Sequence, residues 1–144
     1  MSDSAENISG VWWLQSREDW THDGQRRIDP VLGSDPIAIL CYSTTHFAAQ
    51  FMKRDRSGLD VQANVTGTNN TAAIGGYDAY FGTYKIEEDG MVAHTLIGSV
   101  NPANIGMTVL RNLKVEDDQL TIKLDTTTLE GEAIIRTLVF NRIK

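Results

Sequence analysis

The sequence predicts an all-β fold, a single antiparallel up-and-down barrel of about eight strands. Two observations support this prediction. Short runs of alternating apolar and polar residues are separated by clusters of Gly, Asp, Asn and Pro, and almost no segment has a sustained helical spacing. The 144 residues contain no internal repeat and no linker, so residues 1–144 are expected to form one domain with a full core.

The expected strands follow one another along the chain, with turn residues between them. The Asp-Gly step in the segment EEDG predicts a tight hairpin, and the acidic residues 116–118 separate two further strands. The polar, Gly- and Asn-rich residues 54–70 are predicted to form a loop or a mobile lid, and residues 72–79 could hold a single helical turn. Residues 54–79 are expected to include the most mobile part of the chain and to flank the open mouth. The predicted strands are Val11 to Arg17, Pro36 to Tyr42, His46 to Lys53, Phe81 to Glu87, Met91 to Ser99, Thr108 to Val115, Leu120 to Asp125 and Glu132 to Ile143.

Charge and cysteine content argue against several kinds of partner and location. The 13 basic and 19 acidic residues give a net charge of −6, and the basic residues are scattered, so nucleic acid is not an expected partner. The solitary Cys41 cannot form an internal disulfide, and the opening MSDSAENISG does not resemble a signal peptide, which favours a cytoplasmic location. No apolar run approaches the roughly 20 residues that span a bilayer, so no membrane partner is expected.

A series of motifs makes the chain similar to a known family. The segment ISGVWWL, which includes Gly10 and Trp12, contains the Gly-x-Trp signature with which lipocalin-type barrels open their first strand. The chain resembles the bacterial and fungal lipocalin-like domain family through four further segments. These are PIAILCYSTTHFAAQFMKRDR, YDAYFGTYKI, the strand around His94 followed by SVNPANIGMTVLR, and the final TLVFNR. The chain departs from the family pattern at His46, where Gly is frequent, and at Ala93 and Thr95, where a second His or an acidic residue is frequent.

The resemblance implies an up-and-down β-barrel with an interior of ligand size, and it implies no particular reaction. In barrels of this type the tryptophan of the signature, here Trp12, plugs the closed end. An arginine of the last strand, here Arg142, often lies against this ring. Stacking of the two would be a cation–π contact of roughly 1 kcal/mol. The expected partner is a small organic molecule inside the barrel.

Strand alternation assigns Arg111 and His94 to the barrel interior. Arg111 shares its strand face with Val109 and Leu113, whereas the opposite face carries Lys114. The assignment of His94 is weaker, because both faces of its strand contain apolar residues. Two such polar groups in an apolar interior need a partner or a ligand.

The remaining candidate residues come from neighbouring strands. Lys85 marks the outer face of its strand, so Tyr84 is expected to point inward. Both faces of the strand that begins at residue 46 contain apolar residues, so the sequence does not decide which of its side chains point into the barrel. The predicted catalytic residues are His94, Arg111 and Tyr84, and the predicted ligand-binding residues are Gln50, Tyr80, Val109, Met52 and Leu96.

These side chains suit acid–base chemistry without a cofactor. A neutral His can take up a proton near pH 7, a Tyr hydroxyl can donate one, and Arg can hold a carboxylate or enolate oxygen. Isomerisation, elimination, hydration or cyclisation next to a carbonyl group fits such a pocket. The three His and one Cys have no metal-ligand spacing, and the chain contains neither a Gly-x-Ser-x-Gly elbow nor a phosphate-binding loop, so neither a metal nor a cofactor is expected.

Plainer interpretations remain open for each residue. His94 could be a core or rim histidine bonded to a neighbour, Arg111 could pair with a carboxylate such as Asp78, and the two tyrosines could be packing residues. Three functions therefore compete: a cofactor-free enzyme of isomerase, lyase, hydratase or cyclase type acting on a small, partly apolar compound; a carrier or sensor of a small hydrophobic ligand; and a filled barrel kept for association. A homodimer is also left open. The enzyme is favoured, because burying Arg, His and Tyr is costly for a container of oily ligands.

Overall fold

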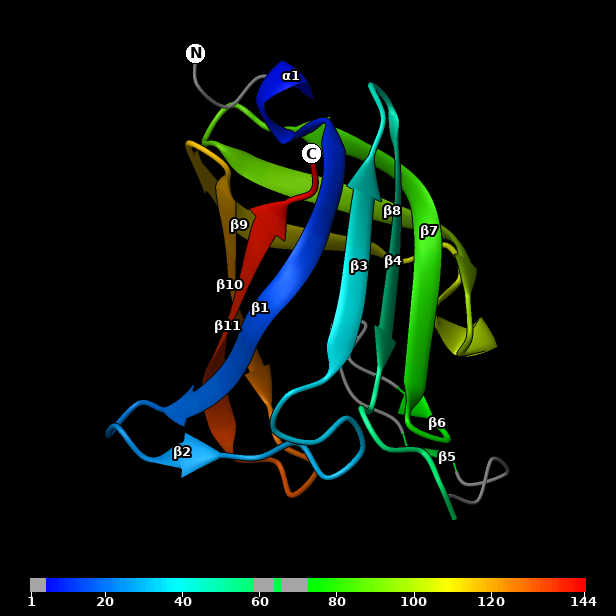
Figure 1. Cartoon of the computed structure of the whole chain (residues 1–144), viewed down its shortest axis with the longest axis vertical. Helices are drawn as coiled ribbons and strands as arrows, with labels where there is room; N and C mark the ends of the chain where they lie inside the picture. The colour runs from blue at the N-terminus through cyan, green and yellow to red at the C-terminus, as the bar shows by residue number, and fades with distance from the viewer. Residues whose placement is uncertain (1–4, 59–63, 66–72) are drawn as a thin grey trace.

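A closed antiparallel barrel of eight strands forms the body of the molecule in the computed structural model, which describes residues 5–58, 64–65 and 73–144 (Figure 1). Each strand of the ring pairs with the next one along the chain, and the last pairs with the first, so the predicted up-and-down barrel is confirmed. The strands of the ring are β1 (Gly10–Thr21), β3 (Ile37–Tyr42), β4 (His46–Met52), β7 (Tyr77–Ile86), β8 (Met91–Ser99), β9 (Thr108–Glu116), β10 (Gln119–Thr127) and β11 (Ala133–Arg142).

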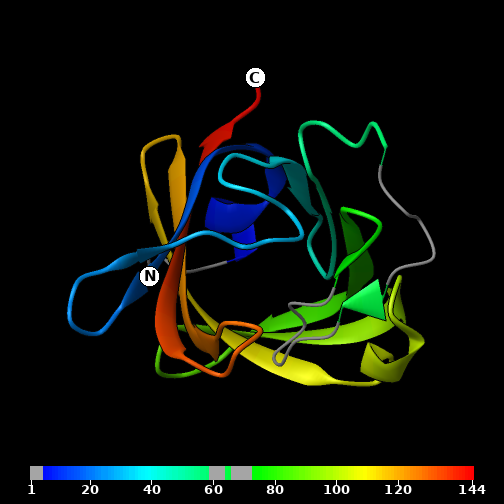
Figure 2. The same ribbon diagram turned by 90° about the horizontal axis from the view of Figure 1, so that it is seen from below.

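Short elements lie at the ends of the ring. The helix α1 (Ala5–Ile8) covers the end at which β1 begins, and β2 pairs with the opposite end of β1 (Figure 2). The predicted helical turn at residues 72–79 is wrong, because the described part of that segment forms β6 and the start of β7. Most of the loop predicted at residues 54–70 lies outside the described residues. The short elements besides α1 are β2 (Arg26–Arg27), β5 (Asn64–Val65), β6 (Ala73–Ile74) and the 3-10 helix η1 (Pro102–Asn104).

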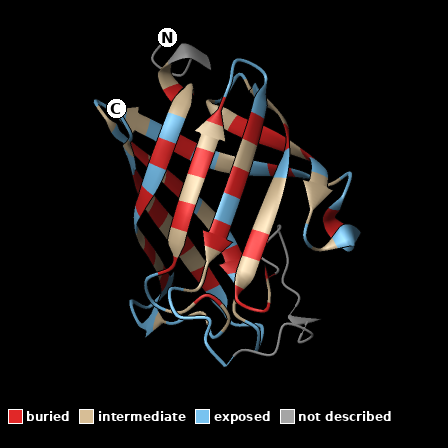
Figure 3. Cartoon of the chain, turned by 45° about the vertical axis from the view of Figure 1, so that its right-hand side comes forward, coloured by how far each residue is buried: buried red, intermediate tan, exposed pale blue. Residues whose placement is uncertain are grey.

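Side chains alternate between the interior and the surface along the strands (Figure 3). The inward residues from all sides of the ring meet in one apolar core. No helix among the described residues is long and apolar enough to span a bilayer. The most deeply buried large side chains are Trp12, Leu96, Leu120, Ile134 and Phe140.

An irregularity in β1 reverses which of its residues face inward. Trp12 and Leu14 are buried at the start of the strand, and the register with β11 then shifts between Leu14 and Ser16. Beyond this bulge Arg17 and Asp19 are buried instead. A bulge adds one residue to one strand, so the alternation continues with the opposite parity. Two charged residues therefore lie inside the barrel.

Trp12 closes the end of the barrel beneath α1. Its ring is fully buried, and its Nε1 donates a hydrogen bond of 2.9 Å to the carbonyl oxygen of Ile8. The guanidinium carbon of Arg142 lies 4.2 Å from the centroid of the Trp12 ring. Arg142 also donates hydrogen bonds to the carbonyl oxygens of Ser9, at 2.7 Å, and Asn7, at 2.9 Å. The predicted contact between Trp12 and Arg142 is confirmed.

Gly10 of the Gly-x-Trp signature makes room for this contact. Its φ angle is 132°, a conformation that side chains rarely adopt, and a Cβ at this position would lie 2.8 Å from Nη1 of Arg142. A larger residue would therefore displace the arginine from the ring and strain the backbone at the start of β1. The glycine of the signature serves the closure of the barrel.

Replacing Arg142 with Lys should destabilise the fold by about 1–2 kcal/mol, because Lys keeps the charge but loses the planar stacking and the geometry of the hydrogen-bond pair. Urea unfolding followed by tryptophan fluorescence measures the change. Asn141→Ala, an exposed neighbour on β11, is the control. An Arg142→Lys midpoint equal to that of the wild type would show that the cap contributes nothing beyond charge.

Candidate functional site

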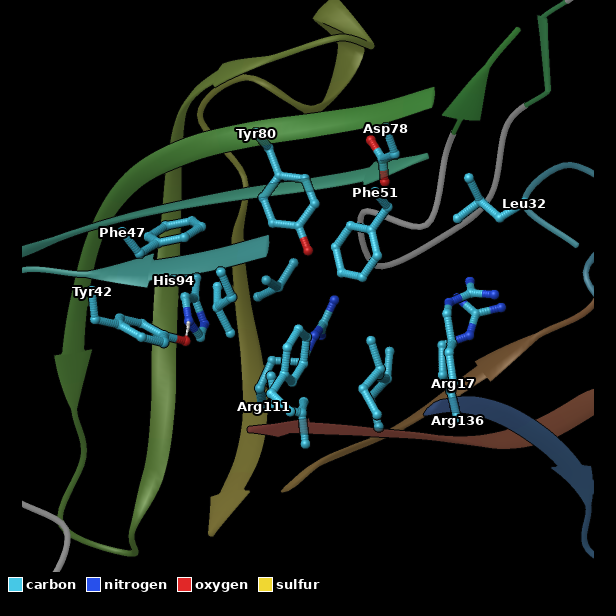
Figure 4. A pocket seen from close by; sticks show the side chains of 16 residues that line it. Arg17, Leu32, Tyr42, Phe47, Phe51, Asp78, Tyr80, His94, Arg111 and Arg136 are labelled. Carbon is cyan, nitrogen blue, oxygen red and sulfur yellow. Dashed lines mark hydrogen bonds between the residues drawn. The ribbon is translucent and has the colours of Figure 1, made fainter. Parts of the chain in front are cut away.

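An internal cavity of about 60 Å³ lies among the inward side chains of the barrel (Figure 4). A water molecule needs roughly 10–15 Å³ of such a volume, so the cavity has room for a few waters, and a ligand with an aromatic ring requires the lining side chains to move apart. All strands of the ring contribute to the lining, together with Leu32 from the segment before β3. Most of the lining is apolar or aromatic. The polar side chains that line it are Arg17, Tyr42, Asp78, Tyr80, His94, Arg111 and Arg136.

Four residues predicted for the site line this cavity: Tyr80, His94, Val109 and Arg111. Leu96 is 1% exposed and belongs to the core without lining the cavity. The alternation of residues along β8 and β9 therefore correctly predicts that His94, Val109 and Arg111 face the interior. His94 and Arg111 contact the same enclosed space, as the sequence predicts.

Gln50 and Met52 lie on the outer face of β4, which corrects their predicted place in the ligand pocket. Phe47 and Phe51 take the inner positions of this strand, and both line the cavity. Gln50 is exposed, and its Oε1 accepts a hydrogen bond from the hydroxyl of Tyr77. The physical reason is volume: the aromatic rings fill the interior, which alternation in the sequence cannot decide when both faces contain apolar residues.

Tyr84 belongs to the inner face of β7 but does not line the cavity. A bulge shifts the β7–β8 register between Phe81 and Gly82, and the residue left without a pair is on β8, so β7 keeps its alternation. The Tyr84 hydroxyl donates a hydrogen bond of 2.7 Å to the carbonyl oxygen of Ser43. Its ring meets that of Tyr42 edge-on, with the centroids 4.9 Å apart. Tyr84 therefore positions Tyr42, which itself lines the cavity.

His94 is buried at one end of the cavity between aromatic neighbours. Its Nε2 lies 2.6 Å from the Tyr42 hydroxyl oxygen, and its ring meets Phe47 edge-on at 4.6 Å. Burial, and then the positive charge of Arg111, lowers the pKa of His94 to about 3. The imidazole is consequently neutral near pH 7 and a weak base there. His94 is a hydrogen-bonding partner of Tyr42, and its predicted role as an acid or base stays a prediction.

The second ring nitrogen of His94 is left unsatisfied. Nδ1 is buried and has no hydrogen-bond partner among the residues that the structure describes. Leaving a buried polar atom unpaired costs about 1–3 kcal/mol, and native proteins contain few such atoms. Nδ1 is a donor if Tyr42 donates to Nε2, and an acceptor if Nε2 donates to Tyr42. Either tautomer leaves the hydrogen-bonding capacity of Nδ1 unused.

Arg111 brings a positive charge to the cavity from β9. Its side chain points toward the space below the Tyr80 hydroxyl (Figure 4). Its Nη1 donates a hydrogen bond of 3.0 Å to the carbonyl oxygen of Leu110. Burial lowers the pKa of Arg111, but a guanidinium stays charged at physiological pH. The positive charge of Arg111 lowers the pKa values of both His94 and Tyr80, so the protonation of these two groups depends on Arg111.

A charged cluster, which we define as Arg17, Asp19, Asp29, Asp78 and Arg136, lies at the other end of the cavity, and three of its members line the cavity: Arg17, Asp78 and Arg136. Arg136 donates two hydrogen bonds, of 2.8 and 3.0 Å, to Asp19, and Arg17 donates one of 3.1 Å to Asp29. The cluster thus has two arginines and three carboxylates. Burial raises the pKa of Asp78 to about 7, against the opposing effect of Arg17 and Arg136.

Alternation in the sequence reveals this cluster only in part. Arg136 shares the parity of Leu138 on β11, a signal that the last strand does contain. Arg17 and Asp19 follow the bulge and flank the charged Glu18, so no local signal turns them inward. Among the described residues, no group of three or more His, Cys, Asp or Glu side chains is placed so that it could hold a metal ion.

Replacing Asp78 with Asn should change how stability depends on pH. The carboxyl group keeps its proton up to about pH 7 in the folded chain, whereas in the unfolded chain it loses the proton near pH 4. Between these values the unfolded state binds fewer protons, so the free energy of unfolding falls as the pH rises. The stability of Asp78→Asn relative to the wild type should therefore increase, by on the order of a few kcal/mol in total, as the pH rises from 4 to 8.

Urea unfolding of both proteins at several pH values in this range measures the difference. Glu88→Gln, an exposed carboxylate in the turn before β8, is the matched control. A stability difference between Asp78→Asn and the wild type that does not change with pH would show that Asp78 ionises as it does in the unfolded chain.

Comparison with known proteins places this barrel in a family. The model of the lipocalin-like domain family matches residues 9–143, nearly the whole chain. None of the curated proteins compared with the chain is significantly similar to it. The matched region contains all eight strands of the ring and both residues of the Trp12–Arg142 contact. Lipocalin-like barrels can bind small hydrophobic ligands. The chain belongs to the lipocalin-like domain family.

Proposed function

We propose that the cavity binds a small, partly apolar organic anion such as a carboxylate. The observation that carries the proposal is that Arg111 and His94 line one largely apolar cavity and that the buried Nδ1 of His94 has no hydrogen-bond partner among the described residues. An anionic oxygen would pair with the guanidinium, and a second polar atom of the ligand would satisfy Nδ1. The aromatic rings of Phe47 and Phe51 would contact the apolar part.

The charges around the cavity favour an anion over a neutral oil. The lining includes three arginines, Arg17, Arg111 and Arg136, and the carboxyl group of Asp78. Asp29 and Asp19 pair with Arg17 and Arg136. These six groups sum to +1 while Asp78 holds its proton and to zero after it ionises. A carboxylate would therefore enter a cavity whose charge is positive below about pH 7 and balanced above it.

Cofactor-free acid–base catalysis is the second candidate function, of the isomerase, lyase, hydratase or cyclase type. The observation that favours it is the placing of neutral donors near Arg111. Burial, and then the charge of Asp78, raises the pKa of Tyr80 to about 12, so its hydroxyl keeps its proton. A guanidinium with a neutral phenol and a neutral imidazole beside it can stabilise an oxyanion that forms from a carbonyl group. A carrier, the alternative, would bind the same compound and release it unchanged.

The location and assembly of the protein belong to the same proposal. A cytoplasmic protein fits the free thiol of Cys41, which is half-buried on β3. The homodimer left open by the sequence stays a prediction. Size-exclusion chromatography with light scattering measures the assembly state directly.

Binding of phenylacetate compared with phenylacetamide tests the anion site, because the two molecules differ in charge and hardly in shape. Isothermal titration should show tighter binding of phenylacetate, and Arg111→Ala should weaken it about 10- to 100-fold, since a hydrogen bond to a charged group contributes roughly 1.5–3 kcal/mol. Asn112→Ala, on the outer face of β9, is the matched control. Equal affinity for the two compounds, or an Arg111→Ala variant that binds phenylacetate as the wild type does, would overturn the proposal.

A double variant separates the ligand role of His94 from its role in the fold. Tyr42→Phe with His94→Leu replaces both partners of the buried hydrogen bond by apolar groups of similar size and removes the unsatisfied Nδ1. The free energy of unfolding should stay within about 1 kcal/mol of the wild type, because both partners are removed together. Phenylacetate affinity should fall at least tenfold. Urea unfolding and calorimetric titration measure the two effects, and retained affinity would return His94 to a packing role.

A further inference from the structure

Asp78 is a carboxylate built into the wall of the cavity. It lies on the inner face of β7 two residues before Tyr80, and its side chain is next to Phe51, across the cavity from His94 (Figure 4). Only 4% of its surface is exposed. His94, whose buried Nδ1 has no hydrogen-bond partner among the described residues, lines the same cavity.

The charged cluster does not need Asp78 for its ion pairs. Arg136 is held by both oxygens of Asp19, and Arg17 is held by Asp29. Asp78 is therefore a third carboxylate beside two arginines that already have partners. Burying such a group is costly in a structural role, and burial accordingly raises its pKa to about 7. Buried titratable groups of this kind in clefts are typical of acid–base sites.

We propose that Asp78 is a general base that removes a proton from the carbon next to the carbonyl group of a bound keto acid, while Arg111 holds the oxygen that becomes negative. This inference rests on the proposed anion binding in the cavity. It assigns the proton transfer to Asp78, and it assigns hydrogen bonding to His94. The charges of Asp78 and Arg111 both act on the hydroxyl of Tyr80: Asp78 raises its pKa and Arg111 lowers it.

The step balances without a cofactor. A carboxylate oxygen of Asp78 takes the proton as the C–H bond breaks, and the electron pair of that bond forms the C=C bond of an enolate. The π electrons of the carbonyl group move to its oxygen, where the guanidinium of Arg111 stabilises the charge. Return of a proton from Asp78 to the carbon restores the keto acid. In D₂O the proton on Asp78 exchanges for deuterium, so deuterium enters the carbon.

Phenylpyruvate is a suitable probe, because it has an aromatic ring, a carboxylate and a CH₂ group next to a carbonyl group. Proton NMR in D₂O follows the loss of the CH₂ signal, with a protein-free sample for the spontaneous rate. The wild type should accelerate the exchange. In Asp78→Asn the exchange rate above the spontaneous rate should be about 10²–10⁴-fold lower than in the wild type. The affinity of this variant for phenylpyruvate should stay within a few-fold of the wild-type affinity. Glu88→Gln should match the wild type in rate.

The pH profile gives a readout that a structural role would not change. The wild-type rate should rise with pH and level off above about pH 7, because only the ionised carboxylate can accept the proton. The groups that face Asp78 are Arg17 from β1, Arg136 from β11, Asp29 from the segment before β3 and Tyr80 on its own strand. Arg17 and Arg136 favour ionisation and Asp29 opposes it.

The outcomes separate the two proposals. Phenylpyruvate binding without accelerated exchange overturns the role of Asp78 and leaves the anion site standing. If the Asp78→Asn variant still accelerates the exchange, another group is the base, and this result also overturns the role of Asp78. Absence of phenylpyruvate binding overturns the role of Asp78, and absence of phenylacetate binding as well overturns the anion site. The conservative variant Asp78→Glu keeps the carboxylate and should keep part of the exchange rate, which guards against an Asp78→Asn variant that fails to fold.

Discussion

The pairing of β4 with β7 closes the ring, and the rest of the structure depends on this closure. The seven paired positions run from His46 opposite Thr83 to Met52 opposite Tyr77. Closure removes free strand edges and converts one face of every strand into an interior that water cannot reach freely. A side chain that would be an ordinary half-exposed group on an open sheet becomes a buried group here. The unusual protonation behaviour of the interior follows from this constraint.

The two ends of the cavity respond to burial in opposite directions. At one end burial keeps His94 neutral by lowering its pKa to about 3, and at the other end it keeps Asp78 neutral by raising its pKa to about 7. His94 therefore makes the fold less stable as the pH falls from about 6.5 toward 3, whereas Asp78 makes it less stable as the pH rises from about 4 toward 7. Since these windows overlap, the two effects partly cancel between about pH 4 and 6.5. The interior can thus contain both groups at neutral pH without two uncompensated charges.

The residues of the family signature and the residues of the cavity do different work. Gly10, Trp12 and Arg142 close one end of the barrel through a stacked ring and three hydrogen bonds to backbone carbonyl oxygens. The cavity polar groups come from β1, β3, β7, β8, β9 and β11. The Gly-x-Trp signature does not include them, although five of them lie in the other segments by which the chain resembles the family: Tyr42, Asp78, Tyr80, His94 and Arg111. A match to the family therefore establishes the architecture, and the chemistry of this chain has to be argued from its own interior side chains.

The sequence by itself determined the number and order of the strands and the positions of the hairpin turns, because alternation and turn residues are local properties of the chain. It also placed Val109, Arg111 and His94 inside, since each shares a parity with apolar neighbours. Tertiary structure alone decided that Arg17 and Asp19 turn inward, because the bulge in β1 exists only in its pairing with β11. Tertiary structure also decided which face of β4 points inward, because both faces contain apolar residues and the volume of the Phe47 and Phe51 rings distinguishes them. The pKa of Asp78 is a further example: it depends on burial and on charges from β1, β11 and the segment before β3, residues that the fold brings together from distant parts of the chain.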